Sequence, residues 1–432
     1  MRRGLVAVLG LGVLALGVLA SVGLAVRMLG GSEDEPPEAA VTQVDAATQV
    51  ARGRYLALAG NCAACHTERG AAVYAGGRAI ETPFGRVYAS NLTPDRDTGI
   101  GAWSADDFWR ALHHGKSKDG SLLYPAFPYP NFTRVTRADA DALYVFLRTV
   151  PSVRQANRAH ALRFPYDNRL LLAVWRALYF KPGAFRPDAT RDAEWNRGAY
   201  LVQGLGHCNA CHTQRNRLGG SDLGADLAGG MIPMLDWYAP ALNADVVHGL
   251  GAWDAGEIVA LLKTGIAARG AVSGPMAEVV YRSLQHLDNA DLRAMANYLK
   301  SLPSPVAGGA VPGAASAADE RQLAAGAKLY ERHCVDCHGA EGRGYPTAYP
   351  PLAGNRSLTM VSPANPIRVV LNGGFPPGTS GNPRPFGMPP YRPSLDDEQV
   401  AAVVSYVRQA WGNRAAPVSP VEVDRFRAAP LD

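Results

Sequence analysis

At 432 residues the chain is too long for one ordinary hydrophobic core, which predicts about two to four domains. Apolar residues make up 47% of the chain and charged residues only 19%, as in a globular protein. The formal net charge of +5 is spread along the chain without a Lys/Arg block, so no nucleic-acid partner is expected.

The chain opens with an uncharged apolar run, Gly4 to Val26, behind two arginines. This run is long enough to span a bilayer as a helix, and the arginines would keep the N-terminus in the cytoplasm. A cleaved signal peptide is the alternative, because Val-Leu-Ala at 18–20 resembles a cleavage site. Residues 1–30 are therefore predicted to be a membrane anchor or signal, and residues 31–45 a polar spacer. Both alternatives export the rest of the chain.

Six cysteines form three C-x-x-C pairs, and each pair is followed at once by a histidine. The motifs are Cys62, Cys65 and His66; Cys208, Cys211 and His212; and Cys334, Cys337 and His338. This is the attachment signature of c-type haem, in which two thiols bond to one porphyrin and the histidine binds its iron. Zinc and thioredoxin-like sites also use C-x-x-C, but no cysteine is left over to complete a zinc site. Three motifs in an exported chain predict three covalently attached haem c groups.

The sequence around the motifs repeats, which indicates an internally duplicated architecture. RGRYLALAGNCAACHT, which begins at Arg52, matches RGAYLVQGLGHCNACHT, which begins at Arg197. AAGAKLYERHCVDCHG, which begins at Ala324, is a more distant copy. Each copy is predicted to start with a helix that delivers the cysteines. Strand-like alternation is scarce, so the predicted fold class is all-α, with three tandem domains built around one haem each.

Each copy is also predicted to close with a helix whose apolar stripe packs into the core. In the second copy, Asp288 caps a run that includes Met295, which is assigned to the core and not to iron. In the third copy, Ser394 with Asp397 is predicted to form the capping-box-like start of the last helix. The predicted domains are residues 46–186, 187–303 and 319–432, and residues 304–318 form a Gly/Ala/Pro-rich linker between the second and third.

The iron of an electron-carrying haem usually has a ligand on each face, and a methionine opposite the histidine raises its potential. Met276 in VSGPMAEVV and Met388 in PFGMPPY each lie in a loop before a closing helix. They are the predicted sixth ligands of the second and third haems, and the alternative is that each is a hydrophobic plug. Met231 and Met234 are rivals in the second unit, but they come too early in it.

The first unit contains no methionine, and its corresponding loop, LYPAFPYPNF, offers Phe127. A phenyl ring cannot ligate iron. Repeat matching puts His113 and His114 at the end of the preceding helix, where either is a candidate ligand. The alternatives are that both are solvated residues favoured by the helix dipole, or that water, Lys116 or another group binds the iron.

With TPFGRVYASNLTPDRDTGIGAWSADDFWRALHHG, GLGHCNACHTQRNRLGG and GPMAEVVYRSLQHLDNADL beside the three motifs, the chain resembles one family. It resembles the tri-haem cytochrome c subunits of bacterial membrane-bound periplasmic dehydrogenases of the alcohol, gluconate and aldehyde type. The resemblance covers residues from about 46 to 426. It implies three class I cytochrome c domains, axial pairs His212–Met276 and His338–Met388, and a first-domain methionine where Phe127 stands.

The resemblance also implies a catalytic subunit that oxidises an alcohol, an aldehyde or a sugar acid with quinone, flavin or molybdenum chemistry. The chain would be its non-catalytic electron-transfer subunit at the periplasmic face of the inner membrane and would pass electrons to ubiquinone or a terminal oxidase. Two other functions stay open. One is a peroxidase-like haem enzyme that uses an open first haem, and the other is a storage or scaffold module between soluble cytochromes. Neither fold nor motif names the substrate.

Overall fold

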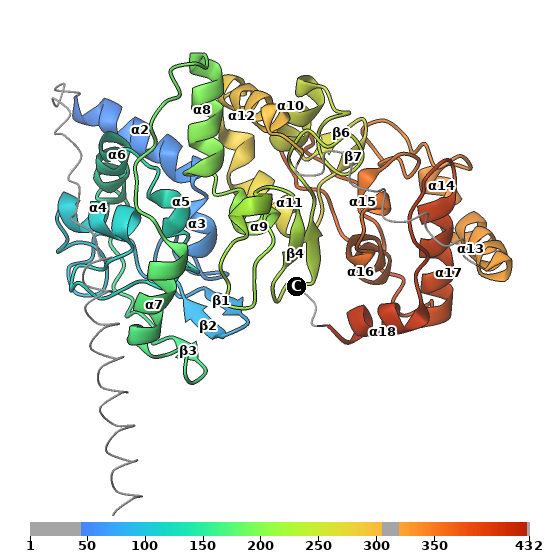
Figure 1. Cartoon of the computed structure of the whole chain (residues 1–432), viewed down its shortest axis with the longest axis horizontal. Helices are drawn as coiled ribbons and strands as arrows, with labels where there is room; N and C mark the ends of the chain where they lie inside the picture. The colour runs from blue at the N-terminus through green and yellow to red at the C-terminus, as the bar shows by residue number, and fades with distance from the viewer. Residues whose placement is uncertain (1–44, 305–318, 430–432) are drawn as a thin grey trace, which may run out of the picture.

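The computed structural model describes residues 45–304 and 319–429, which are mostly helical (Figure 1). This agrees with the predicted helical class, and the strands that accompany the helices are at most four residues long. The predicted anchor or signal at 1–30, the spacer up to residue 44 and linker residues 305–318 lie outside the described residues. Among the helices of the two described ranges, none combines the length and apolar character needed to cross a bilayer.

The elements follow the three sequence repeats, which are called the first, second and third units below. The first unit contains α2 (Ala46–Ala59), α3 (Cys62–Cys65), β1 (Ala79–Thr82), β2 (Gly85–Tyr88), α4 (Ala105–His114), α5 (Tyr129–Phe132), α6 (Arg137–Leu147), β3 (Ala161–Leu162) and α7 (Arg169–Tyr179). The second contains α8 (Ala193–Gln203), α9 (Asn209–His212), η1 (Leu223–Ala225), β4 (Gly230–Ile232), β5 (Trp237–Ala239), α10 (Ala255–Thr264), β6 (Ile266–Ala267), β7 (Gly270–Ala271), α11 (Pro275–Arg282), η2 (Leu284–His286) and α12 (Asn289–Ser301). The third contains α13 (Glu320–His333), α14 (Val335–His338), α15 (Arg356–Thr359), α16 (Ala364–Asn372), α17 (Asp397–Gln409) and α18 (Pro420–Ala428). The strands form antiparallel sheets in the order β1-β2-β3, β4-β5 and β6-β7.

In every unit the helix before the haem motif packs on the closing helix, as α2 on α6, α8 on α12 and α13 on α17. Each pair crosses at a glycine of its first helix. An added Cβ would lie 1.9 Å from a carbonyl oxygen of the closing helix at Gly53, 2.0 Å at Gly198 and 2.2 Å at Gly326. Only glycine permits so close an approach of two backbones. The glycine of RGRY, RGAY and AGAK is thus the packing contact that all three repeats share.

The start of α12 agrees with the sequence, and the start of α17 does not. Asp288 is at the predicted N-cap position of α12, but its side chain makes no capping hydrogen bond there. The capping box predicted at Ser394 with Asp397 is wrong, because Asp396 is the N-cap of α17. The Asp396 carboxylate accepts from the Gln399 backbone N–H, and the Gln399 side chain accepts from the Asp396 backbone N–H. The capping box is therefore real but begins two residues later.

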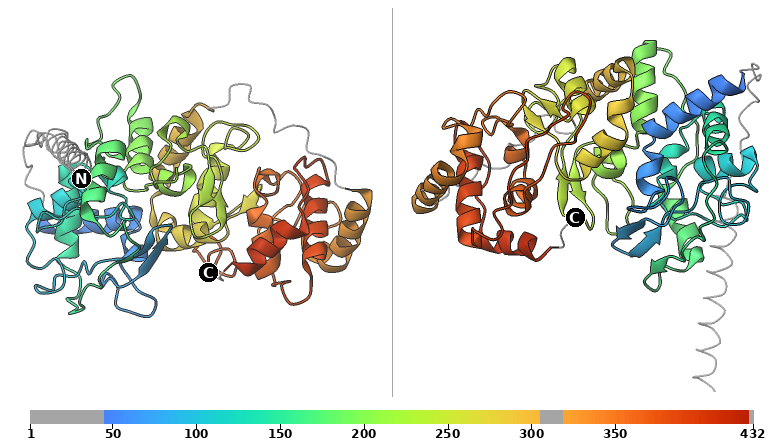
Figure 2. Two further views of the ribbon diagram at one scale, coloured as in Figure 1. Left: turned by 60° about the horizontal axis from the view of Figure 1, so that its bottom comes forward. Right: turned by 180° about the vertical axis from the view of Figure 1, so that it is seen from behind.

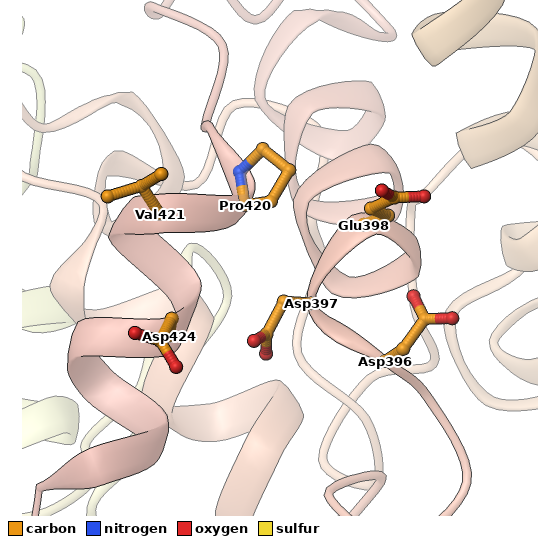
Figure 3. A pocket seen from close by; sticks show the side chains of 6 residues that line it. All are labelled: Asp396, Asp397, Glu398, Pro420, Val421 and Asp424. Carbon is orange, nitrogen blue, oxygen red and sulfur yellow. The ribbon is translucent and has the colours of Figure 1, made fainter.

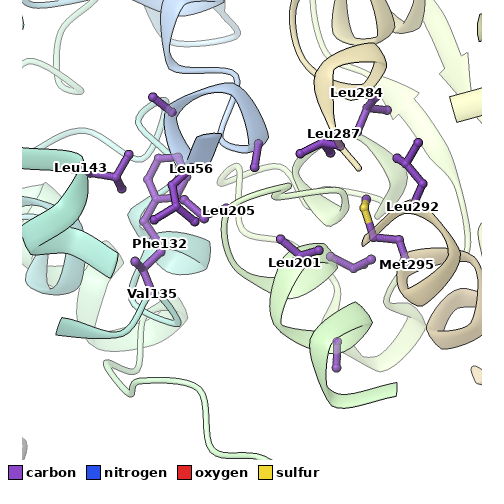
Figure 4. Close-up of a cluster of buried hydrophobic side chains, with 14 of the residues drawn as sticks. Leu56, Phe132, Val135, Leu143, Leu201, Leu205, Leu284, Leu287, Leu292 and Met295 are labelled. Atoms are coloured by element: carbon purple, nitrogen blue, oxygen red, sulfur yellow. The ribbon is translucent and has the colours of Figure 1, made fainter. Parts of the chain in front are cut away.

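The first two units share one hydrophobic core, and most of the third unit has its own. Figure 4 shows part of the shared core, in which first-unit residues and second-unit residues form one cluster: Leu56, Phe132, Val135, Leu143, Leu201, Leu205, Leu284, Leu287, Leu292 and Met295. Met295 is 2% exposed, which confirms its assignment to the core. The other core contains Ile367, Val400 and Val404. In both views of Figure 2 the units lie in a row with the second in the middle.

Reciprocal hydrogen bonds join the first two units. Tyr200 Oη donates to Asp139 Oδ2 at 2.6 Å, and Tyr55 Oη donates to Asp291 Oδ2 at 2.7 Å. The two tyrosines hold the same position in RGRY and RGAY, and each aspartate is the third residue of its closing helix. Two homologous units that exchange the same contact form a pseudo-twofold interface.

The third unit lacks the residues that make this interface. In the first two units the carboxylate also pairs with an arginine of its own repeat, Arg52 or Arg197. The corresponding positions of the third unit hold Ala325, Lys328 and Gln399 in place of arginine, tyrosine and aspartate. The third unit therefore docks on the second through other contacts.

Candidate functional site

Each C-x-x-C-H motif forms a short helical turn directly after the first helix of its unit, within α3, α9 and α14 and the residues beside them. Because the two cysteines are three residues apart on such a turn, both thiols face the same side. All six cysteines are described, and all six are free thiols. In the first two motifs the residue before the first cysteine has a left-handed backbone, with φ of 50° at Asn61 and 36° at His207. The turns therefore present pairs of thiols, as haem attachment requires.

The histidine of each motif is oriented by a backbone carbonyl. Its Nδ1 donates to a carbonyl oxygen at 2.7 Å in His66, 2.7 Å in His212 and 3.1 Å in His338. Since a carbonyl only accepts, Nδ1 carries the proton and the Nε2 lone pair is available to iron. Burial lowers the pKa of all three histidines, to about 4 for His212, and so keeps the imidazoles neutral.

The thiols lie in surroundings that suit a porphyrin better than a zinc ion. Burial raises the pKa of Cys62 and Cys208 to about 12 and that of Cys334 to about 11, which disfavours the thiolates that zinc requires. Burial also raises the pKa of Cys65, and the nearby Cys211 raises it further. The first and second motifs thus lie close together. Each motif therefore offers what one bound haem needs, which is two cysteines that can form thioether bonds and one histidine that can bind the iron.

Met276 is the second residue of α11, where its half-buried side chain packs against the shared core. The loop before it turns at Gly274, whose φ is 55°, and an added Cβ there would lie 2.5 Å from the ring of Trp237. Glycine is required at this turn for both reasons. The methionine is therefore held at a defined position at the start of a helix.

Each of the first two motifs contacts the ligand-loop region of the other unit. Arg78 donates to the carbonyl of Ala64 inside the first motif and forms a bidentate ion pair with Glu278 of α11, at 2.7 and 2.9 Å. In the other direction, Asn131 of α5 donates to Asn209 Oδ1 inside the second motif at 2.8 Å. These contacts fix the two predicted haem sites relative to each other.

The loop of Met388 is pinned to the end of α16. Met388 N donates to Gly374 O at 2.8 Å, and Gly374 N donates to Met388 O at 3.0 Å. The predicted equivalence of the helix ends before the ligand loops is confirmed, since α4, α10 and α16 all end at glycines with positive φ. These are Gly115 (φ 58°), Gly265 (φ 81°) and Gly373 (φ 65°).

Phe127, in the loop where the resemblance implies a methionine, packs against the shared core. Its half-buried ring lies 5.2 Å from the ring of Phe132. Phe132 in turn meets the ring of His207, next to the second motif, edge to face at 5.6 Å. Phe127 therefore makes an aromatic contact in a chain of rings that leads toward the second unit.

His113 is not a solvated helix-end residue, so that alternative is wrong for it. It is 5% exposed, and its ring stacks on Trp109 at 4.4 Å. One ring nitrogen bonds to the Thr133 backbone, and Nδ1 is buried without a hydrogen-bond partner among the described residues. Burial, and secondly the charge of half-buried His114, lowers the pKa of His113 to about 4. Iron ligation by either histidine stays a prediction.

The chain matches known proteins over most of its length. The cytochrome c family model matches residues 50–151 and 323–411. The chain is 39% identical to the cytochrome c subunit of alcohol dehydrogenase (quinone) from Gluconacetobacter polyoxogenes, over 88% of this chain and 84% of that protein. It is 40% identical to the gluconate 2-dehydrogenase cytochrome c subunit of Pantoea cypripedii, over 88% of this chain and 89% of that protein. The chain belongs to the family of dehydrogenase cytochrome c subunits.

Membership of this family identifies the chain as an electron-transfer subunit. It also confirms the family resemblance that the motifs indicated. The chain is also 41% identical to a subunit of nicotinate dehydrogenase from Pseudomonas putida, over 88% of this chain but 32% of that protein. The chain thus spans about a third of that longer relative. None of these three relatives is named as a peroxidase or a soluble carrier, so neither alternative function gains support from them.

Sequence reasoning missed Arg356 of the cytochrome subunit, which reaches from the third unit into the second. Its guanidinium donates to Ala241 O at 3.2 Å and Gly249 O at 2.9 Å, and it lies over the ring of Trp253 at 5.1 Å. Burial lowers the pKa of Arg356 to about 10, and its charge contributes, after burial, to the lowered pKa of His212. No local pattern signals this contact, because it joins residues more than a hundred positions apart.

A hollow between α17 and α18 of the cytochrome subunit lies outside the haem motifs (Figure 3). It is lined by Asp396, Asp397, Glu398, Pro420, Val421 and Asp424. Three of these acids stand at the start of α17, where negative charge stabilises the helix N-terminus. Asp397 also pairs with Arg427 of α18 at 2.5 Å. The acids of this hollow therefore serve the helix start and the packing of α18.

Proposed function

We propose that the chain is the membrane-associated tri-haem subunit that carries electrons away from a periplasmic dehydrogenase acting on an alcohol, an aldehyde or a sugar acid. It would accept electrons from the catalytic subunit and deliver them to ubiquinone or a terminal oxidase at the periplasmic face of the inner membrane. The observation that carries the proposal is the presence of three complete C-x-x-C-H motifs, each with its histidine Nδ1 held by a backbone carbonyl.

Bound haem c would supply one-electron exchange between ferrous and ferric iron. The residues proposed to hold the three groups are Cys62, Cys65 and His66; Cys208, Cys211, His212 and Met276; and Cys334, Cys337, His338 and Met388. Phe127 stands in the loop where the first group would find a methionine. Because the thioether ligand raises the potential, the first site should have the lowest potential of the three.

The interface between the first two units supports direct electron exchange between their sites. The reciprocal Tyr–Asp bonds and the Arg78–Glu278 pair hold both motifs in one rigid body with one core. Exchange between them then requires no domain movement. The catalytic subunit would be quinone-, flavin- or molybdenum-dependent, and it would set the substrate.

The test is to isolate the complex in mild detergent from membranes of the native organism. We expect one catalytic subunit to copurify, three haem c per cytochrome chain as measured from the absorbance of the pyridine complex, and reduction of the haem bands on addition of its substrate. A ubiquinone analogue should then reoxidise the haems. Two haems per chain would contradict the count, and a complex without a catalytic subunit or without any substrate-driven reduction would overturn the proposal.

A further inference from the structure

Helix α7 presents an apolar face to solvent at one edge of the first unit, beside β3 (Figures 1 and 2). Leu170 is 76% exposed and Leu178 is 65% exposed, and Val174, between them on the helix, is also exposed. These residues are four apart and so form one stripe, to which exposed Leu171 adds width. A helix face that meets water normally carries polar side chains. The face is therefore expected to be covered in the working protein.

The opposite face of α7 is fixed against the rest of the protein, so the outward stripe cannot turn inward. Leu172 is buried, and Trp175 Nε1 donates to Leu218 O at 2.9 Å. The guanidinium of Arg176 lies over two aromatic rings, at 5.1 and 4.7 Å from their centres. The helix is thus apolar on both faces, and only one of them has partners among the described residues.

The apolar surface continues into the loop before α7. Phe164 is 86% exposed, and Tyr166 is exposed beside it. Six of the 19 large apolar side chains exposed in the described ranges lie within this short segment, which marks a true patch. The patch is called the α7 surface and consists of Phe164, Tyr166, Leu170, Leu171, Val174 and Leu178.

Positive charge flanks the α7 surface. Between residues 163 and 186 the only acid is Asp167. The exposed basic residues of the same stretch are Arg163, Arg169, Lys181 and Arg186. Aliphatic side chains bordered by basic ones match an acyl layer beneath anionic headgroups. Four of the six apolar side chains of the α7 surface are leucine or valine, which are under-represented among the residues that anchor protein partners.

We infer that the α7 surface lies on the lipid bilayer, with its leucines and Phe164 at the boundary of headgroups and acyl chains. The basic residues around it contact anionic headgroups. This inference rests on the proposed membrane association and adds a contact that holds the first unit flat on the membrane. A helix that lies in the interface in this way does not need to span it.

The test uses the full chain with its haems, in vesicles of phosphatidylethanolamine and phosphatidylglycerol, with a protease site introduced between residues 32 and 43. After cleavage, we expect residues 45–432 to sediment with the vesicles at low salt. The double variant Leu170→Asp, Leu178→Asp should lose at least tenfold in the bound-to-free ratio. The matched control is Val246→Asp, Val247→Asp, which changes two similarly exposed apolar side chains of the second unit and should stay bound. Haem spectra and thermal unfolding check that each variant is folded.

Vesicles of phosphatidylcholine alone should bind the cleaved wild type more weakly if the basic residues contribute. Release of the cleaved wild type from both vesicle types, or equal retention of the α7 double variant, would overturn the inference. Loss of the catalytic subunit from the double variant without loss of vesicle binding would assign the α7 surface to a protein partner instead. Substrate-driven haem reduction in the same complexes tests the proposed function separately, since it does not depend on vesicle binding.

Discussion

The bond between Tyr200 and Asp139 should contribute strongly to the stability of the first two units. Asp139 is 2% exposed, and its Oδ2 accepts from Tyr200 Oη at 2.6 Å. Tyr200→Phe removes this charged hydrogen bond, and such bonds contribute about 1.5–3 kcal/mol. It also leaves a carboxylate oxygen buried without its donor, so we expect a loss near the upper end of that range. Tyr55→Phe should cost less, about 1–2 kcal/mol, because Oδ2 of Asp291 keeps its bond to Arg197, whereas Arg52 bonds only to the other oxygen of Asp139.

Guanidinium unfolding followed by circular dichroism and by haem absorbance measures both losses. The control is Tyr298→Phe, which removes a neutral bond to Gln203 inside the second unit and should cost about 0.5–1.5 kcal/mol. The shared core predicts that both haem signals of the first two units change in one transition. A change below about 0.5 kcal/mol for Tyr200→Phe would refute the role assigned to this bond.

The Tyr55 variant should also show a defined pH dependence. Burial alone would raise the pKa of Asp291, but hydrogen bonds from Arg197 and Tyr55 outweigh it and lower the pKa below its ordinary value of 3.8. A lowered carboxyl pKa contributes stability that is present above the ordinary value and is lost as the pH falls through the folded value. The difference between wild type and Tyr55→Phe should therefore be constant at neutral pH and shrink below about pH 4.

Three further predictions concern the haem ligands and are read by redox titration of the purified protein. Met276→Ala and Met388→Ala should each lower the potential of one haem, because the iron loses its methionine ligand while the cysteines still hold the porphyrin. An unchanged titration would mean that the wrong methionine was chosen. Phe127→Met should raise the potential of the first haem and abolish its binding of carbon monoxide if no histidine ligates it. Arg356→Gln should lower the potential of the His212 haem by tens of millivolts, since a nearby cation favours the reduced iron, and a shift confined to another haem would contradict this.

The haem motifs could be predicted from the sequence because their chemistry is local. Two thiols and an imidazole must meet one porphyrin, and C-x-x-C-H brings them together on a single turn wherever it occurs. The repeat pattern was equally local, so the helix ends before the ligand loops and the equivalent positions of Met276 and Phe127 followed from alignment within the chain. The start of α17 was misplaced by two residues because several acids near Ser394 compete for the cap.

Only the tertiary structure determined the contacts between residues that are far apart in the chain. The partners of Tyr55 and Arg356 lie more than a hundred positions away, and no spacing rule selects them. Burial of His113 depends on how α4 lies against its neighbours, so its position in the helix could not reveal it. For α7, only Arg169 and Arg176 interrupt the apolar residues around the helix, so the pattern does not say which apolar side packs. Groups that lie close together in the sequence can be predicted from it, whereas the contacts between distant residues depend on how the helices pack in three dimensions.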